Sequence, residues 1–291
     1  LARAYYLLDY ALADQGRMAE ATNWQHAASI FENLGDLWSL AEVISNAGAD
    51  AYERGEWHEA LTLFDRARDL RLKVGDVAEA SICTANAAEI LIEQGRLEAA
   101  DGLVREALRV ARAAEYHYIE AFVLCLLGCL ESRWRNFDEA VVAFARGREI
   151  AQRVGHRAVA LEIDVRTAEM YMLQGDWGRA AFQVTRTLRE GLAFDGIQSR
   201  VPMLHRLRGE CHLHEGDMKG ARESFERSLT TARERMSFYD LALTVQAVAR
   251  LDALEGRPLD IDAINESRAT LERLDVPAPA YGEPSQARVA L

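Results

Sequence analysis

Proline is nearly absent from most of this sequence. Of the five prolines in 291 residues, four stand at position 258 or later (Pro258, Pro277, Pro279 and Pro284), and Pro202 is the only one before them. Proline breaks helix interiors because it lacks an amide hydrogen and clashes with the preceding turn. Its absence over so long a stretch predicts an all-α structure.

Cysteine, basic residues and long apolar runs are also scarce. Four cysteines are too few for a disulfide scaffold in a chain of this length and predict a reducing, cytoplasmic location. Lys plus Arg total 34 against 46 for Asp plus Glu, a net charge of −12, which disfavours nucleic acid and anionic membranes as partners. No apolar run approaches the ~20 residues that span a bilayer, so we expect no membrane segment.

Catalytic and metal-binding motifs are missing too. The sequence has no Gly-x-Ser-x-Gly, no Walker-type phosphate loop, no His-Glu-x-x-His and no Gly-x-Gly-x-x-Gly, so we predict no enzyme activity and no cofactor. Cys211, His212 and His214 would diverge on a helix rather than converge on zinc. Cys125 and Cys129, four residues apart, are expected to be buried thiols. We therefore expect no metal site.

What the sequence does contain is an internal repeat. Short turn motifs recur every 39 to 41 residues and are centred on positions 16, 55, 95, 135, 175, 216 and 256. Five residues after the centre, the first six copies carry an alanine: Ala21, Ala60, Ala100, Ala140, Ala180 and Ala221. A second series of turns lies about 20 residues after the first: Gly35-Asp36, Gly75-Asp76, Glu115-Tyr116, Gly155-His156, Asp195-Gly196, Met236-Ser237 and Asp275. Two turns per repeat, with apolar positions at helical spacing between them, predict two antiparallel helices per repeat.

Seven helix pairs follow from this register. First helices are expected near 1–14, 36–54, 76–94, 117–134, 156–174, 199–215 and 237–255. Second helices are expected near 18–34, 57–74, 97–114, 137–154, 177–193, 218–235 and 259–274. The repeats lie near 1–35, 36–75, 76–115, 116–155, 156–195, 196–236 and 237–275.

Several details support these boundaries. Pro202 falls in the first turn of its helix, behind a candidate cap at Ser199, while Asn136, Asp176 and Asp217 are placed to cap the helices that follow them. Residues 276–291 hold three prolines and little periodicity, and we predict an extended or disordered tail after an array over 1–275. The sequence starts inside an amphipathic pattern without an initiator Met, so we expect a piece of a longer polypeptide.

The repeat resembles the tetratricopeptide repeat. Repeat two carries the family's small and aromatic positions as Gly48, Gly55, Ala60, Phe64 and Ala67. Other repeats depart from the aromatic position, with Gln25, Val104 and Val184. The forty-residue period and the segments 86–100 and 162–170 are similar to C-terminal arrays of bacterial class III adenylate/guanylate cyclases with an ATPase module and of LuxR/maltose-activator-type signalling proteins. The resemblance implies a right-handed α-solenoid whose first helices line a concave surface.

The resemblance also implies which residues face that surface. Taking the turn glycine as the family's fifteenth position, the concave positions predict binding residues at Asn46, Asn86, Glu89, Phe122, Arg166, Glu169, Arg206 and Gln246. Asn46 and Asn86 match the asparagine column that holds a peptide backbone, because an amide both donates and accepts. The lysine of the carboxylate clamp is missing at position 2. A plainer alternative is that Arg166 simply pairs with Glu162 or Glu169 along its own helix.

We therefore predict a noncatalytic protein- or peptide-binding module of a multidomain bacterial signalling or transcriptional regulator, acting as scaffold or sensor. The partner would be a protein or peptide segment, including another domain of the same polypeptide. A small-molecule effector domain and a self-associating, homo-oligomeric module are the alternatives, and an enzyme ranks last.

Overall fold

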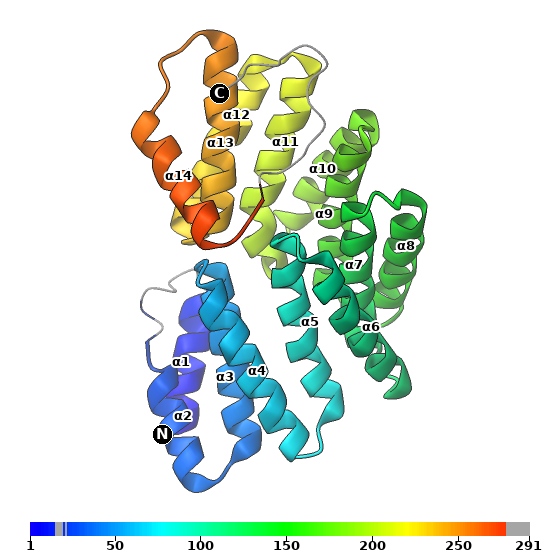
Figure 1. Cartoon of the computed structure of the whole chain (residues 1–291), viewed down its shortest axis with the longest axis vertical. Helices are drawn as coiled ribbons and strands as arrows, with labels where there is room; N and C mark the ends of the chain where they lie inside the picture. The colour runs from blue at the N-terminus through cyan, green and yellow to red at the C-terminus, as the bar shows by residue number, and fades with distance from the viewer. Residues whose placement is uncertain (15–19, 21, 278–291) are drawn as a thin grey trace.

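The chain is all-helical over residues 1–14, 20 and 22–277, which the computed structural model describes (Figure 1). The helices are α1 (Ala2–Asp14), α2 (Trp24–Leu34), α3 (Leu37–Glu53), α4 (Trp57–Lys73), α5 (Val77–Glu93), α6 (Leu97–Ala113), α7 (His117–Arg133), α8 (Phe137–Arg153), α9 (Arg157–Gln174), α10 (Trp177–Gly191), α11 (Val201–Glu215), α12 (Met218–Glu234), α13 (Phe238–Glu255) and α14 (Ile261–Arg273). A short 3-10 helix, η2 (Asp195–Arg200), precedes α11. The predicted fold class, an α-solenoid of helix pairs, is confirmed for these residues.

The turns between helices share one backbone conformation. Eight glycines, including Gly55 and Gly95, have φ between 68° and 83°, the left-handed region that ends a helix. Where the repeat lacks glycine, the residue present takes the same conformation: Arg135, for example, has φ 64°. The turn Asp195-Gly196 is the exception, since η2 occupies that place. The period therefore predicted the positions of these turns even where glycine is replaced.

The predicted caps are only partly correct. The carboxylates of Asp176 and Asp217 accept hydrogen bonds from the third backbone N–H of the helices they begin. Asn136 stands at the corresponding position, but its amide donates to the Glu131 carboxylate at 2.9 Å and caps nothing. Ser199 lies inside η2, and α11 begins after Arg200 with Pro202 in its first turn. A short extra helix thus replaces the predicted serine cap.

Within each of repeats two to six, the paired helices cross at a matched small and large residue. A Cβ built on Gly128 of α7 would lie 2.5 Å from Cε1 of Phe144 on α8, so the ring occupies the space that the missing side chain leaves. Gly48 with Phe64 and Gly209 with Phe225 repeat this arrangement. In the repeats between them, the same register holds alanine and valine: Ala88 with Val104, and Ala168 with Val184. The valines noted above as departures are therefore balanced by a larger residue opposite.

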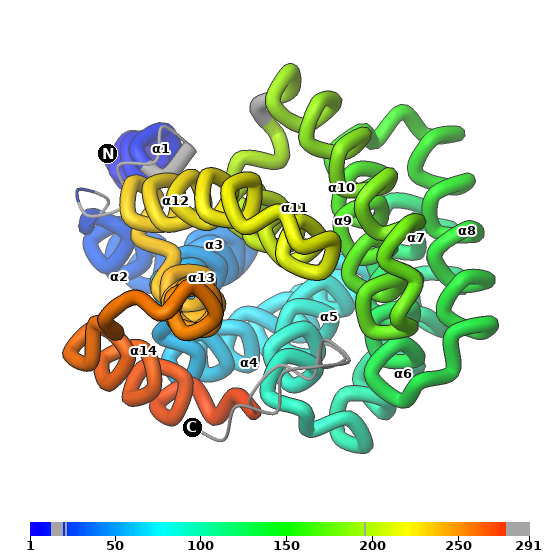
Figure 2. Tube along the Cα trace, turned by 90° about the horizontal axis from the view of Figure 1, so that it is seen from above, coloured from blue at the N-terminus to red at the C-terminus, as the bar shows by residue number. Residues whose placement is uncertain are grey.

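The last helix pair returns to the second and third repeats. Figures 1 and 2 both place α13 and α14 beside α3, α4 and the end of α5. Leu274 is 1% exposed and belongs to the same apolar cluster as Trp57 and Phe64 of repeat two. The Gln94 side-chain amide donates to the Leu274 carbonyl oxygen at 3.0 Å across 180 positions of sequence. The superhelix thus closes on itself.

Some predicted features cannot be compared. Gly16 and Ala21 of the first repeat, and residues 278–291 of the predicted tail, lie outside the described residues. Of the tail, Val276 packs against the apolar clusters of repeats two and seven. Pro277 lies beside Gly95, at the turn between α5 and α6. These two residues extend the closing contact.

Candidate functional site

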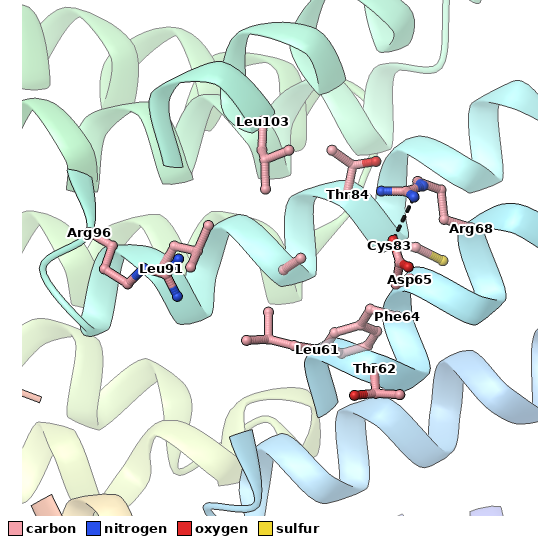
Figure 3. Close-up of a pocket in the computed structure, with 11 residues that line it drawn as sticks. Leu61, Thr62, Phe64, Asp65, Arg68, Cys83, Thr84, Leu91, Arg96 and Leu103 are labelled. Atoms are coloured by element: carbon pink, nitrogen blue, oxygen red, sulfur yellow. Dashed lines mark ion pairs between the residues drawn. The ribbon is translucent and has the colours of Figure 1, made fainter. Parts of the chain in front are cut away.

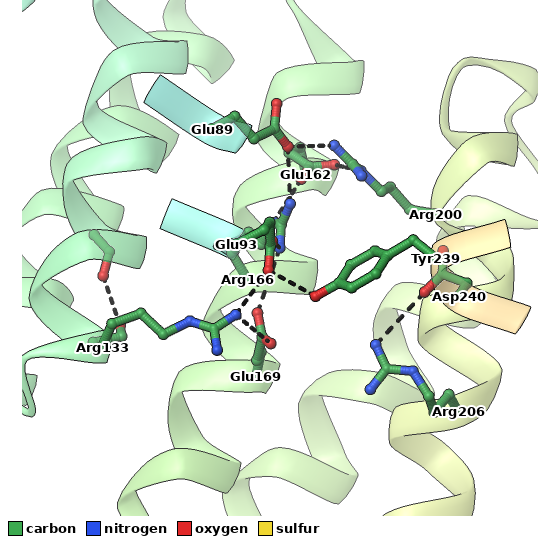
Figure 4. Close-up of polar contacts among 12 residues, drawn as sticks. Glu89, Glu93, Arg133, Glu162, Arg166, Glu169, Arg200, Arg206, Tyr239 and Asp240 are labelled. Carbon is green, nitrogen blue, oxygen red and sulfur yellow. Dashed lines mark hydrogen bonds and ion pairs between the residues drawn. The ribbon is translucent and has the colours of Figure 1, made fainter. Parts of the chain in front are cut away.

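The centre of the concave side holds a buried arginine surrounded by glutamates (Figure 4). Arg166 on α9 is 4% exposed. Its guanidinium lies 2.9 Å from Glu89, 2.6 Å from Glu93, 2.9 Å from Glu162 and 3.5 Å from Glu169. Glu89 and Glu93 come from α5, whereas Glu162 and Glu169 lie on α9 with Arg166. The arginine therefore links the first helices of repeats three and five. The predicted pairing of Arg166 with Glu162 or Glu169 along its own helix is present, but these are only two of the four glutamates that contact it.

Two further arginines complete this cluster, which we call the charge network. Arg200, the last residue of η2, lies 2.8 Å from both Glu89 and Glu162. Arg133 of α7 lies 2.9 Å from Glu93. Multiple pairing is what makes such burial tolerable, because an ion taken from water costs several kcal/mol unless opposite charges and hydrogen bonds replace the lost hydration. The network links α5, α7, α9 and η2.

Titration of Glu93 reflects these contacts. Burial raises the pKa of its carboxyl, but the positive charges of Arg166 and Arg133 outweigh burial and hold the pKa at about 2. The carboxylate is therefore ionised over the whole physiological range. This ionised group also accepts a hydrogen bond from the hydroxyl of Tyr239 on α13, at 3.0 Å.

That bond is part of the seam where the superhelix closes. The Tyr239 ring packs edge-on against Trp57, with 4.9 Å between ring centroids. Trp57 in turn stacks on Tyr52, whose hydroxyl donates to Glu89 at 3.3 Å. Aromatic side chains thus connect repeats two and seven to the charge network.

The carboxyl of Glu53, at the end of α3, has a pKa that its surroundings shift. Burial raises the pKa of its carboxyl to about 7; Arg200 opposes the rise and the carboxylates of Asp240 and Glu89 add to it. A folded-state pKa above the ordinary value of 4.5 means that folding favours the protonated form. The stability from this preference is complete below about pH 4.5 and is lost as pH rises through about 7.

We expect Glu53→Gln to remove this dependence. The thermal midpoint of the unaltered chain should fall more steeply between pH 5 and pH 8 than that of the variant. Glu59→Gln, an exposed carboxylate on α4, is the matched control and should behave as the unaltered chain. Parallel pH profiles for the Glu53→Gln variant and the unaltered chain would contradict the assignment.

The N-terminal part of the concave side is open instead. A cavity of about 710 Å³ lies across α1, α3, α5 and α7; we call it the N-terminal groove. It is lined by Tyr6, Tyr10, Trp38, Glu42, Ser45, Asn46, Ala49, Arg71, Asp76, Glu79, Ile82, Asn86, Tyr116, Tyr118 and Phe122. Aromatic rings, two side-chain amides and an excess of carboxylates thus surround one space.

Hydrogen bonds fix part of this lining. The Asn46 amide donates to the Tyr6 hydroxyl at 2.7 Å, and that hydroxyl donates to Glu42 at 3.1 Å. Burial, then the nearby Glu42 charge, raises the pKa of Tyr6 to about 12, so the hydroxyl remains a donor. The side-chain amide of Asn86, half-buried in the same groove, forms no hydrogen bond with any described residue. Its amide is therefore available to a ligand.

The predicted binding residues fall into separate places. Asn46, Asn86 and Phe122 line the N-terminal groove. Glu89, Arg166 and Glu169 belong to the charge network, where they hold one another.

The other two predicted residues also have partners within the chain. Arg206 on α11 is 2% exposed and pairs with Asp240 at 3.6 Å. The Gln246 amide donates to Ser267 between α13 and α14. In the central and C-terminal repeats, the predicted binding side chains are therefore held by partners within the chain.

Several groove residues were not predicted from their positions in the repeat. Trp38, Asp76, Glu79, Tyr116 and Tyr118 stand in or next to the second series of turns, before the helical positions that the family pattern assigns to the concave side. In the sequence, these residues stand out as aromatic and acidic side chains at turns of the forty-residue period. They were not predicted as binding residues because the turns were interpreted only as helix ends.

A second cavity lies on α4, α5 and α6 (Figure 3). It measures about 440 Å³ and is lined by Leu61, Thr62, Phe64, Asp65, Arg68, Cys83, Thr84, Ala87, Leu91, Arg96 and Leu103. Arg68 and Asp65 form an ion pair at its rim, and no predicted binding residue lines it.

Two sequence expectations concern metals and membranes. Across 1–14, 20 and 22–277, no three His, Cys, Asp or Glu side chains are grouped so that they could hold a metal ion. None of the helices in this described part combines the length and apolar character needed to cross a bilayer.

Comparison with a protein-family model identifies repeats in this chain. The model of the tetratricopeptide repeat matches residues 39–113 and, overlapping, 76–153. The matched segments run from the third residue of α3 to the end of α8 and supply much of the N-terminal groove. A comparison with curated proteins found no match.

Comparison with solved structures extends the fold to most of the chain. One similar structure is a Rap protein complexed with competence and sporulation factor, with a TM-score of 0.69 and 18% sequence identity over 93% of this chain and 72% of that chain. Another is BtubC (BKLC) from P. vanneervenii, with a TM-score of 0.46 and 20% identity over 82% of this chain and 87% of that one. The first similarity shows that the solenoid resembling tetratricopeptide repeats continues beyond residue 153.

Proposed function

We propose that this chain is a noncatalytic module that binds a peptide or protein segment in the N-terminal groove. The observation that carries the proposal is the contrast along the concave side: the centre is filled by paired charges, while the groove is open and contains the unoccupied Asn86 amide. An amide that both donates and accepts matches the backbone of an extended segment. The Rap protein, similar in fold, was crystallised with a factor bound, which supports a binding role.

The test is selection of peptides followed by measurement of their affinity. The whole chain, immobilised, is offered a phage library of random dodecapeptides, and an enriched peptide is synthesised with a fluorophore for anisotropy titration. Asn86→Ala should weaken binding about tenfold, which corresponds to roughly 1.4 kcal/mol. Asn265→Ala, an exposed asparagine on α14, is the control and should leave affinity unchanged. Equal affinities for the two variants would contradict binding at this groove.

We further propose that this binding acts on the closure of the superhelix. Asn86 lines the groove on α5, and Glu89 and Glu93 on the same helix hold the charge network and the Tyr239 hydroxyl. A ligand that moves α5 would therefore bias the closed arrangement against a more open one. This coupling fits a scaffold or sensor within a cytoplasmic, multidomain bacterial signalling or transcriptional regulator, whose other domains are candidate partners. Limited proteolysis of such a parent protein, with and without the selected peptide, should give different cleavage patterns.

A small-molecule effector is the second candidate, because the groove volume of about 710 Å³ suits a ligand of that size. A thermal-shift screen against metabolites would then give a stabilising compound that competes with the selected peptide. Self-association is the third, because Leu1 and, on α1, Leu7, Leu8 and Tyr10 are exposed. Light scattering would then show a mass that rises with protein concentration.

A further inference from the structure

Two carboxylates in the N-terminal groove have no cationic partner. Glu42 on α3 and Glu79 on α5 are half-buried, and neither forms an ion pair with any residue in the described part of the chain. Each accepts a hydrogen bond from a neutral phenol: Glu42 from Tyr6 at 3.1 Å, and Glu79 from Tyr116 at 2.8 Å. A phenol donor stabilises the carboxylate without neutralising it, so both negative charges remain.

The rest of the groove does not supply the missing charge. Its lining contains one cation, Arg71, and that guanidinium is 3.4 Å from Asp76. The formal charge of the lining is therefore −2, from Glu42, Glu79 and Asp76 against Arg71. In the charge network, by contrast, every glutamate contacts at least one arginine.

The aromatic lining shows what kind of cation fits. The Arg71 guanidinium lies over the Trp38 ring, 4.9 Å from its centroid, while it contacts Asp76. One wall of the groove thus already holds a guanidinium between an aromatic face and a carboxylate. Tyr10 and Phe122, which belong to the same lining as the unpaired carboxylates, offer further rings. Rings favour an organic cation over a hydrated metal ion, for which no ligand cluster is found in the described residues.

We propose that the segment bound in the N-terminal groove places a cationic side chain, a guanidinium or an ammonium, against Glu42 and Glu79. This inference rests on the proposed peptide-binding function and adds the chemistry by which the partner is chosen. Asn86 holds the backbone of the segment, and the two carboxylates select its charge. Anionic partners, including phosphorylated peptides and nucleic acids, are repelled by the same charges and by the net charge of −12.

The experiment begins with the same peptide selection, and the amino-acid composition of the enriched peptides is determined. An enriched peptide is then synthesised in two forms, one with its arginine and one with citrulline, which has nearly the same shape and no charge. On the unaltered chain, the citrulline form should bind at least about tenfold more weakly, as expected for one partly desolvated ion pair. On Glu42→Gln and Glu79→Gln chains, the difference between the two peptides should shrink severalfold. Glu98→Gln removes the same charge from an exposed position on α6. It should leave the difference between the two peptides unchanged.

Each result decides between the two proposals. If enriched peptides contain no excess of arginine or lysine, or if the citrulline form binds equally well, the cation inference is overturned while the peptide-binding function stands. If no peptide is enriched, both are overturned. If arginine amide alone binds as tightly as the peptide, the partner is a small cation and not a peptide, and the inference is again wrong. The comparison of peptides on the unaltered chain needs no variant, so it holds even if a substitution impairs folding.

Discussion

Replacing Arg166 with methionine is expected to lower the free energy of unfolding by about 3–5 kcal/mol, as found when one partner of a buried ion pair is removed. Methionine fills much of the same space but leaves Glu89, Glu93, Glu162 and Glu169 facing one another with less positive charge between them. Urea denaturation followed by circular dichroism measures the change.

Two further substitutions make this prediction specific. Arg146→Met removes an exposed arginine that pairs with Glu149 on α8, and it should change stability by less than about 1 kcal/mol. Adding Glu93→Gln to the Arg166→Met variant should recover part of the loss, because one uncompensated charge disappears. If the Arg166→Met and Arg146→Met variants lose similar stability, the network is not a structural element and its residues are free for another role.

Replacing Gly128 with alanine should destabilise the chain by about 1–3 kcal/mol, the usual cost of forcing an extra methyl group into a packed core. The added Cβ would lie 2.5 Å from the Phe144 ring, which is 3% exposed and packed in the core. Gly102→Ala on α6 is the matched control: nothing lies within 4 Å of its Cβ position. That substitution should stabilise the helix by up to about 1 kcal/mol.

The pairing of glycine with phenylalanine can be tested in the same experiment. Gly128→Ala combined with Phe144→Val converts the fourth repeat to the Ala–Val pair found as Ala88 with Val104. The double variant should be more stable than the sum of the two single changes predicts, because each change makes room for the other. Strict additivity would show that the two positions do not pack against each other as described.

The period of the sequence was enough to predict the helices and their turns. Even Arg135, Glu115, Met236 and Asp275, which lack glycine's freedom, take the left-handed conformation that the register assigns to them. Local spacing fixes such features because each turn depends only on its own residues. The irregular η2 was not predictable in this way, although it delivers Arg200 to the charge network.

The closure of the superhelix could not be predicted from the repeat pattern. Curvature accumulates from small rotations between neighbouring repeats, and no single repeat encodes the meeting of Tyr239 with Glu93 across 146 positions. The concave positions were assigned as though the solenoid were open. That is why Arg166 and Glu169 were taken for ligand-binding residues, whereas the structure pairs them with each other, Arg166 also with α5 and Glu169 also with Arg133 of α7.

Hydrogen–deuterium exchange with a selected peptide tests the central claim most directly. The claim is that the concave side is divided into an open N-terminal groove and a charge network filled by its own side chains. If the peptide occupies the N-terminal groove, exchange should slow in the helices that line it, α1, α3, α5 and α7, relative to the free chain. Exchange in α9 and α11, whose concave charges are already buried and paired, should change much less, and only through their contacts with α5 and the closing seam. Protection confined to α9 and α11 would contradict this division and would place the binding site at the charge network instead.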